Sequence, residues 1–278
     1  MRHAFLLLAL CLLACNSGQN GSTPSTDSQE SVATDEQANE SPVDTLSPMP
    51  AKRFNRCWEG TIAGEIPVFL HYQQEEGIVL GAITYLNTKA RTPIRLLGTY
   101  DENGGLLMRE YSEDGNVTGL IVGDPASDSF SGTWYSPEGE KEMTVLLSPK
   151  DSLIPSPSME AEPEDILGTY AYQYGEKGYL GDLDIRKDAN GRIQAQIVSL
   201  TKAPARNIAD VEMENITLED NSFVYSLPEA DSCAFQVRFF KDFAYVTYTQ
   251  SDCMGQFGHR ATVEGMFVKV PKERETTD

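Results

Sequence analysis

Apolar and polar residues alternate along most of the chain after residue 55. In "IPVFLHY" (66–72), for example, Val68, Leu70 and Tyr72 alternate with the residues between them. A period of two places successive side chains on opposite faces of an extended chain, as in a half-buried strand. No stretch of residues 51–149 has convincing helical spacing, so the pattern predicts β-structure.

Residues 51–149 contain about eight such segments, separated by short turn sequences. Pairs such as Asn103-Gly104 and Asp114-Gly115 suit hairpin turns because they tolerate positive φ. The predicted strands are 57–64, 66–72, 78–86, 93–100, 106–111, 117–122, 129–135 and 141–148.

Residues 164–278 repeat this organisation, with one helical turn expected at 204–209. The predicted strands are 167–174, 179–187, 192–200, 210–218, 222–227, 234–240, 243–249 and 261–270. Short links favour antiparallel meanders, and closure of a sheet removes its exposed edges. The expected fold is therefore all-β, with two tandem antiparallel meander domains, each a small barrel or sandwich of about eight strands.

Two segments lack the pattern of a folded domain. Residues 16–50 have no basic and no aromatic residue, so they cannot bury enough apolar surface to offset their ordering entropy. With Cys15 they are predicted to form a lipidated, disordered tether over 15–50. The proline-rich residues 150–163 are predicted to form a linker between domains at 51–149 and 164–278.

The chain begins with Arg2 and an apolar run, Phe5–Ala14, of signal-peptide length. This run ends in "LLAC" (12–15), which resembles a bacterial lipobox. The resemblance implies that residues 1–14 are removed and that Cys15 carries a lipid anchor in the membrane. An ordinary signal peptide cut nearby is the alternative. Because such lipoproteins disfavour an acidic residue after the lipidated cysteine if they are to leave the inner membrane, and Asn16 is neutral, the resemblance further implies the outer rather than the inner membrane of the cell envelope.

The chain is strongly acidic, with a formal net charge of −20. Removing residues 1–14 takes away Arg2, so 21 basic and 42 acidic residues remain, a net charge of −21. This charge argues against nucleic acid and against electrostatic docking on anionic lipid, and it permits a basic protein partner. The alternative is that acidity only keeps an exported protein soluble.

Three cysteines remain once residues 1–14, which include Cys11, are removed and Cys15 is lipidated. Cys233 precedes one predicted strand and Cys253 follows the next, about equally far from a turn at Lys241-Asp242. In an oxidising compartment, this placement predicts a disulfide between them. Cys57 is left as a buried free thiol or an intermolecular link.

The stretch "SDCMGQFGHR" (251–260) places Cys253 near His259, yet no metal site is predicted. The disulfide uses the thiol, and His71 lies in the other block. Asp182 and Asp184 alternate on one strand, where a solvated face is a better interpretation than a carboxylate pair for catalysis. No nucleophile or phosphate-binding motif occurs, so neither an enzyme nor a cofactor is expected.

Two other kinds of site remain open. Trp58 and Trp134 are predicted either to line a ligand pocket at a barrel mouth or to pack in the core. The tripeptides 44–46 and 151–153 resemble the Asp-Ser/Thr-aliphatic acceptor for O-glycosylation of exported proteins in some Gram-negative bacteria. This resemblance implies candidate sites at Thr45 and Ser152.

The second block, with its cysteine-tied hairpin and terminal "EGMFVKV" (264–270), loosely resembles small β domains of bacterial lipoproteins. Some of these inhibit lysozymes, but the shared features include no specific motif, so no inhibitory residue is carried over. The sequence therefore favours a membrane-anchored, non-catalytic envelope lipoprotein that binds a protein partner. The alternatives are a β-barrel carrier of a small apolar ligand and, as a minor one, a hydrolase.

Overall fold

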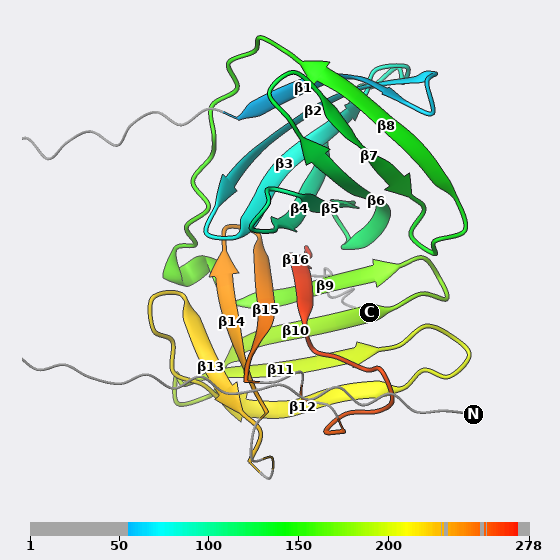
Figure 1. Cartoon of the computed structure of the whole chain (residues 1–278). Helices are drawn as coiled ribbons and strands as arrows, with labels where there is room; N and C mark the ends of the chain where they lie inside the picture. Colours follow the sequence, from blue (N-terminus) through cyan, green and yellow to red (C-terminus); the bar gives the residue numbers. More distant parts are fainter. Residues whose placement is uncertain (1–54, 229, 231–232, 251–252, 254, 272–278) are drawn as a thin grey trace, which may run out of the picture. The chain divides into compact units, whose positions relative to one another are not determined.

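The computed structural model describes residues 55–228, 230, 233–250, 253 and 255–271 (Figure 1). The signal peptide, Cys15 and the tether predicted for the first 50 residues lie outside these ranges. The described residues belong to one compact unit, Pro50–Asp278. The described residues form sixteen strands and one short 3₁₀ helix, so the all-β prediction is confirmed. No helix among the described residues is long and apolar enough to cross a membrane.

The first half, residues 55–149, is a closed barrel of eight antiparallel strands (Figure 1). Each strand pairs with its neighbours in sequence, and the β1–β8 pairing closes the ring. The strands are β1 Arg56–Ile62, β2 Ile66–Glu75, β3 Ile78–Tyr85, β4 Ile94–Tyr100, β5 Leu106–Tyr111, β6 Asn116–Pro125, β7 Phe130–Tyr135 and β8 Glu142–Pro149.

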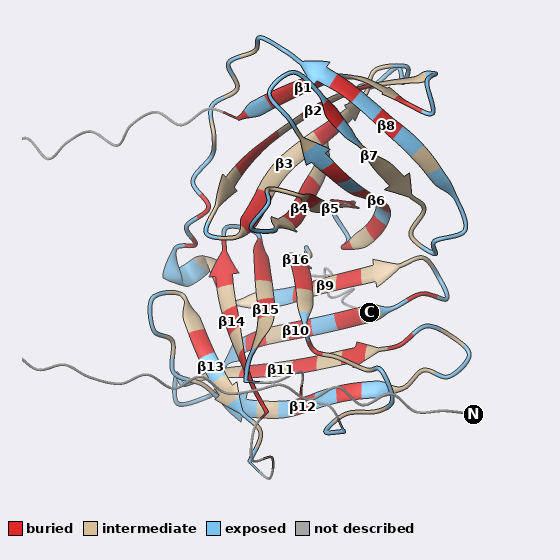
Figure 2. Cartoon of the chain, viewed as in Figure 1, coloured by how far each residue is buried: buried red, intermediate tan, exposed pale blue. Residues whose placement is uncertain are grey.

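Buried positions alternate with exposed ones along these strands, as the sequence pattern requires (Figure 2). The inward side chains form one core cluster, in which Val68, Leu70, Leu96, Met108 and Ile121 are each 0% exposed. A void large enough for water would leave its lining side chains accessible. These side chains therefore fill the described interior of the barrel.

The second half, residues 164–271, forms an eight-stranded sheet that stays open between β12 and β13. Its order is β12-β11-β10-β9-β16-β15-β14-β13, and β13–β16 run across the direction of β9–β12 (Figure 1). The strands are β9 Gly168–Tyr174, β10 Leu180–Lys187, β11 Ile193–Leu200, β12 Ile208–Asn215, β13 Ser222–Ser226, β14 Ala234–Phe240, β15 Phe243–Gln250 and β16 Gly265–Lys269.

The two halves share contacts. The strands β6 and β9 pair in parallel over two residues each, and the Tyr111 hydroxyl of β5 donates to the Met266 carbonyl at 3.1 Å. Ile78 and Leu97, on the outer face of the barrel, belong to the core cluster of the second half. The side of the barrel formed by β3–β5 is thus covered by the second half.

The proline-rich segment departs from one expectation. Residues 150–163 have little regular structure, but Met159 and Ala161 are 6% and 4% exposed and belong to the core of the second half. Glu160 bridges to Phe240 of β14, and the 3₁₀ helix Pro163–Asp165 follows. The segment predicted as a linker is therefore packed against the second half, because two small or flexible apolar residues between the prolines reach inward.

Two smaller expectations were wrong. The helical turn expected at 204–209 is a loop, because the Thr201 amide donates to the Asn207 carbonyl and β12 begins at Ile208. The last strand is shorter than expected and begins at Gly265, so His259 lies in the loop before it.

Candidate functional site

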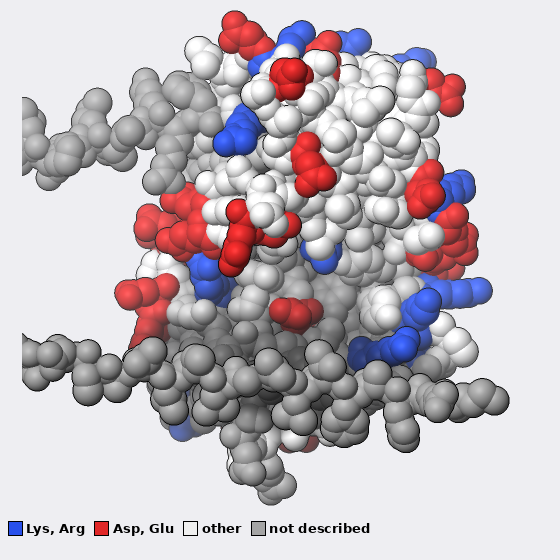
Figure 3. Space-filling model, viewed as in Figure 1, with Lys and Arg blue, Asp and Glu red and all other residues white. Residues whose placement is uncertain are grey.

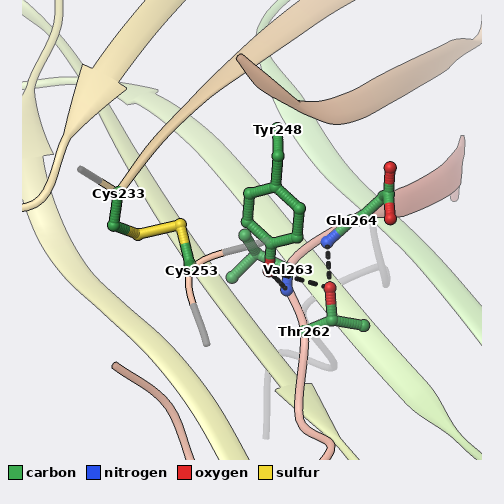
Figure 4. Close-up of a disulfide and its surroundings, with 6 residues drawn as sticks. All are labelled: Cys233, Tyr248, Cys253, Thr262, Val263 and Glu264. Atoms are coloured by element: carbon green, nitrogen blue, oxygen red, sulfur yellow. Dashed lines mark hydrogen bonds between the residues drawn. A yellow bond between two sulfur atoms is a disulfide. The ribbon is translucent and has the colours of Figure 1, made fainter. Parts of the chain in front are cut away.

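The stretch around Cys253 is a corner tied by a disulfide. Cys233 precedes β14 and Cys253 follows β15, and the two are bonded with their Cα atoms 4.7 Å apart, which confirms the predicted pair. Beside the disulfide, the Tyr248 hydroxyl lies 2.8 Å from Thr262 Oγ1 and accepts from the Val263 amide (Figure 4). The loop from Cys253 to Thr262 is therefore held at both ends.

This loop packs against the start of β12. The Gly258 amide donates to the Ile208 carbonyl at 2.9 Å, and the Asn207 side chain donates to the carbonyl of His259. A Cβ on Gly258 would lie 3.0 Å from atoms of Asn207 and Ile208, a tight contact that a side chain could keep only if these neighbours moved slightly. Gly255 has a positive φ of 84°, which fits the turn predicted there.

A hollow of about 600 Å³ lies between β12, the end of β13 and the disulfide corner. The chain segments that form its walls are tied together: the Leu227 amide donates to the Cys233 carbonyl, and the Gln256 amide donates to the Cys253 carbonyl. The disulfide thus fixes one wall against the other. The lining residues are Glu212, Leu227, Pro228, Ala230 and Gln256.

β12 forms the edge of the sheet beside this hollow. Among the described residues it pairs only with β11, and its other edge is covered at Ile208 by Gly258. Asp210, Glu212 and Glu214 are exposed at alternate positions along it, and the structure shows no ion pair for them within the ranges it describes. An open strand edge carrying three carboxylates is suited to an extended chain with basic side chains.

The gap between β12 and β13 is narrow at one point. Burial raises the pKa of Tyr225 on β13, and Glu214 on β12 raises it further. These two side chains therefore approach one another although their strands do not pair. The open edge and the hollow lie along the same unclosed side of the second half.

Trp58 and Trp134 both belong to the core of the barrel. Trp58 is 4% exposed and its ring lies 5.8 Å from that of Phe130, while its Nε1 has no hydrogen-bond partner among the described residues. Trp134 is half-buried against the same cluster, and its Nε1 donates to Glu110 Oε1 at 2.9 Å. Both positions fit the packing alternative.

Glu110 is a buried carboxylate that the sequence did not single out. It is 2% exposed, inside one end of the barrel, and accepts hydrogen bonds from Tyr85, Trp134 and Thr118. Burial raises the pKa of its carboxyl, and the three donors oppose that shift. The three donors are all neutral and come from three other strands, so Glu110 links these strands by hydrogen bonds and has no ion-pair partner among them.

Cys57 is a buried free thiol, one of the two alternatives that the sequence left open. Its Sγ donates to the carbonyls of Ser152 and Asn55, and burial raises its pKa, so the thiolate is disfavoured. His71 lies opposite it on β2 and is paired with the Asn55 side chain at 2.8 Å. Burial lowers the pKa of His71. A buried neutral thiol is a poor nucleophile, so this cysteine and histidine do not form an activated pair.

None of the other described candidate residues lines the hollow. Ser152 is half-buried between exposed Asp151 and Leu153 in irregular backbone, whereas Cys15 and Thr45 lie outside the described residues. Asp184 on β10 is bonded to Arg186, and Asp182 beside it is exposed. Residues 187–192 form a hairpin turn. No three His, Cys, Asp or Glu side chains gather as a metal site in the ranges that the structure describes.

Comparisons with known proteins add little. No family model and no curated protein matches the chain. One crystal structure that aligns with the chain is that of a protein of unknown function from the DUF3598 family of Nostoc punctiforme. It is 10% identical, the match covers 71% of this chain and 78% of that chain, and the TM-score is 0.25. A likeness at this TM-score assigns neither a family nor a function to this chain.

Proposed function

We propose that the protein is a non-catalytic lipoprotein of the cell envelope, anchored through Cys15, that binds a basic protein partner at the open edge of β12. The observation that carries this proposal is the unpaired strand edge with three exposed carboxylates beside a hollow of about 600 Å³. Acidic side chains are also prominent on the face of the molecule shown in Figure 3.

The mode of binding follows from strand geometry. An extended segment added to β12 would satisfy backbone groups of the edge and place every second side chain on one face. Lysine or arginine at alternate positions would then face Asp210, Glu212 and Glu214. The apolar walls at Leu227 and Pro228 would accept a side chain from the partner.

The alternative of an apolar-ligand carrier finds less support. An eight-stranded barrel is only just wide enough to be filled by its own side chains or to hold one small ligand. In this barrel the buried members of the core cluster are only 0–4% exposed, as Trp58 and Leu70 illustrate. The described interior offers an apolar ligand no room without repacking.

The test compares two variants with the same change in charge. The edge variant carries Asp210→Asn, Glu212→Gln and Glu214→Gln, and the control carries neutral substitutions at three exposed carboxylates of the first half, Glu138→Gln, Glu140→Gln and Glu142→Gln. Each lost cross-strand charge pair is worth about 0.2–1 kcal/mol, which predicts a total loss of about 0.6–3 kcal/mol.

The measurement is capture of envelope proteins by the mature chain, followed by binding constants for whatever is captured. Lysozyme serves as a first basic probe because of the resemblance noted for the second half. The edge variant should bind a captured protein more weakly, and added salt should weaken wild-type binding. Equal loss in the control variant would show that net charge alone is responsible and would refute the site.

The lipid anchor is tested separately. Cys15→Ser should release the protein from the membrane fraction, and retention of this variant through carbonate washing would exclude the anchor.

A further inference from the structure

Arg109 occupies an unusual position on β5. Its neighbours Met108 and Glu110 point into the barrel, whereas Arg109 faces the second half and its Nε donates to the Tyr174 hydroxyl on β9 at 2.5 Å. It is only partly exposed. A guanidinium stays charged at all physiological pH values, so a cation is held where the two halves meet.

No carboxylate of the described residues forms an ion pair with this cation. The ion pairs of the described residues join other groups, and none of them includes Arg109. Burial raises the pKa of Glu264, and the positive charge of Arg109 lowers it. Glu264 therefore interacts electrostatically with Arg109, and no ion pair between the two occurs among the described residues. Partly buried charges are normally paired, because desolvation costs free energy that a partner must offset. The arrangement therefore lacks an anion.

Several hydrogen-bond donors around Arg109 have no acceptor among the described residues. Its two terminal nitrogens have no hydrogen-bond partner in the part of the chain that the structure describes. Tyr174 accepts from Arg109 through its oxygen, which leaves its own proton for another acceptor. Tyr245 on β15 lies within electrostatic reach of Arg109, and no hydrogen bond to its hydroxyl occurs among the described residues. In contrast, the Tyr111 hydroxyl already donates its proton to the Met266 carbonyl.

We propose that Arg109, Tyr174 and Tyr245 form a binding site for an oxyanion, either a phosphate or the carboxylate of a small molecule. The two terminal nitrogens of a guanidinium match two oxygens of such a group in a bidentate pair. The tyrosine hydroxyls then donate to the same or the remaining oxygens. This site does not depend on the proposed edge of β12, from which it is separate.

Because the proposed site lies between the two halves, a bound anion should also stabilise the fold. Arg109 belongs to the first half, and Tyr174 and Tyr245 belong to the second. An anion bound to all three is held by strands of both halves. Because ligand binds the folded arrangement alone, its presence should raise the melting temperature of the full chain.

The experiment titrates the mature chain with inorganic phosphate, sulfate and acetate and follows binding by calorimetry. Wild type should show saturable binding of at least one of these ions at one site. Arg109→Gln should weaken it at least tenfold, and Arg109→Lys, which keeps the charge but not the planar fork, should weaken it too. Glu264→Gln should tighten binding, because it removes a negative charge that interacts with Arg109 and would repel the anion.

The matched control is Arg95→Gln, which removes an exposed arginine that is paired with Asp242 across the same interface. It should bind the anion as wild type does. Absence of saturable binding for all three ions would overturn the proposal and leave Arg109 hydrated. Undiminished binding by Arg109→Lys, or loss of binding by Arg95→Gln equal to that of Arg109→Gln, would also overturn it.

Discussion

Removing the disulfide between Cys233 and Cys253 is expected to destabilise the second half by about 3 kcal/mol. The two cysteines are 20 residues apart and 3% exposed each. Cross-linking a loop of this length removes entropy from the unfolded chain, which corresponds to about 3 kcal/mol at 25 °C in the chain-entropy model. A double Cys233→Ala, Cys253→Ala variant removes the cross-link without burying new polar atoms.

The assay is thermal and denaturant unfolding of both proteins, with and without reductant. For a unit of this size, about 3 kcal/mol corresponds to a melting temperature lower by about 6–12 °C. Reductant should lower wild type to the level of the variant and leave the variant unchanged. Cys57→Ala is the control, because this free thiol takes no part in the cross-link.

The same variant tests whether the disulfide holds the walls of the hollow. Leu227 is bonded to the Cys233 carbonyl and Gln256 to the Cys253 carbonyl, so both walls lose their common tie when the sulfurs part. Proteolysis should therefore begin near these residues in the variant. A melting temperature within 2 °C of wild type, or wild-type unfolding that is insensitive to reductant, would refute the reasoning.

Three further predictions concern the interior and the halves. Gly119→Ala would place a Cβ 2.4 Å from Trp134 Nε1, so we expect a loss of about 1–3 kcal/mol and altered tryptophan fluorescence; unchanged values would show that the ring has room to move. Glu110 has a folded pKa above its ordinary 4.5, so protonation stabilises the fold below about pH 4.5 and this stability is lost as pH rises through the folded pKa. The stability of Glu110→Gln relative to wild type, measured by unfolding across that window, should therefore increase with pH, and a constant difference would contradict the assignment. Residues 51–149 should fold alone as a β-rich barrel, and circular dichroism of a disordered chain would exclude this.

The strands were predictable because one face of each is buried. The period of two in 66–72 and 78–86 reports that burial directly, and both segments are strands in the structure. Closure was not predictable, because the same alternation serves a barrel and a sandwich. A clue was nevertheless present: inward-facing glycines such as Gly98 lie opposite a neighbouring strand, where a Cβ would come within 2.0 Å of the Leu107 carbonyl oxygen. Such glycines allow the tight curvature that a small closed barrel needs.

The disulfide was predictable from its placement across one hairpin, but the hollow beside it was not. It is lined by Glu212 of one hairpin, Leu227 of another and Gln256 of the corner, which are distant in sequence. Nothing in the sequence states that β12 and β13 fail to pair. The acidic residues of 210–214 were visible, but alternation of charge on a strand is equally typical of a solvated face.

The environments of the adjacent residues Arg109 and Glu110, in the run Arg109-Glu110-Tyr111, could not be predicted from the sequence. Adjacent opposite charges suggest a local ion pair, yet neighbouring residues of a strand point to opposite faces. Glu110 enters the barrel, where neutral donors from Tyr85 and Trp134 satisfy it, and Arg109 leaves on the other side toward Tyr174. The barrel wall between them keeps each charge from neutralising the other. The carboxylate is satisfied within the core, while the guanidinium has donors without a partner in the described part of the chain, and these donors are the ones that the proposed anion would use.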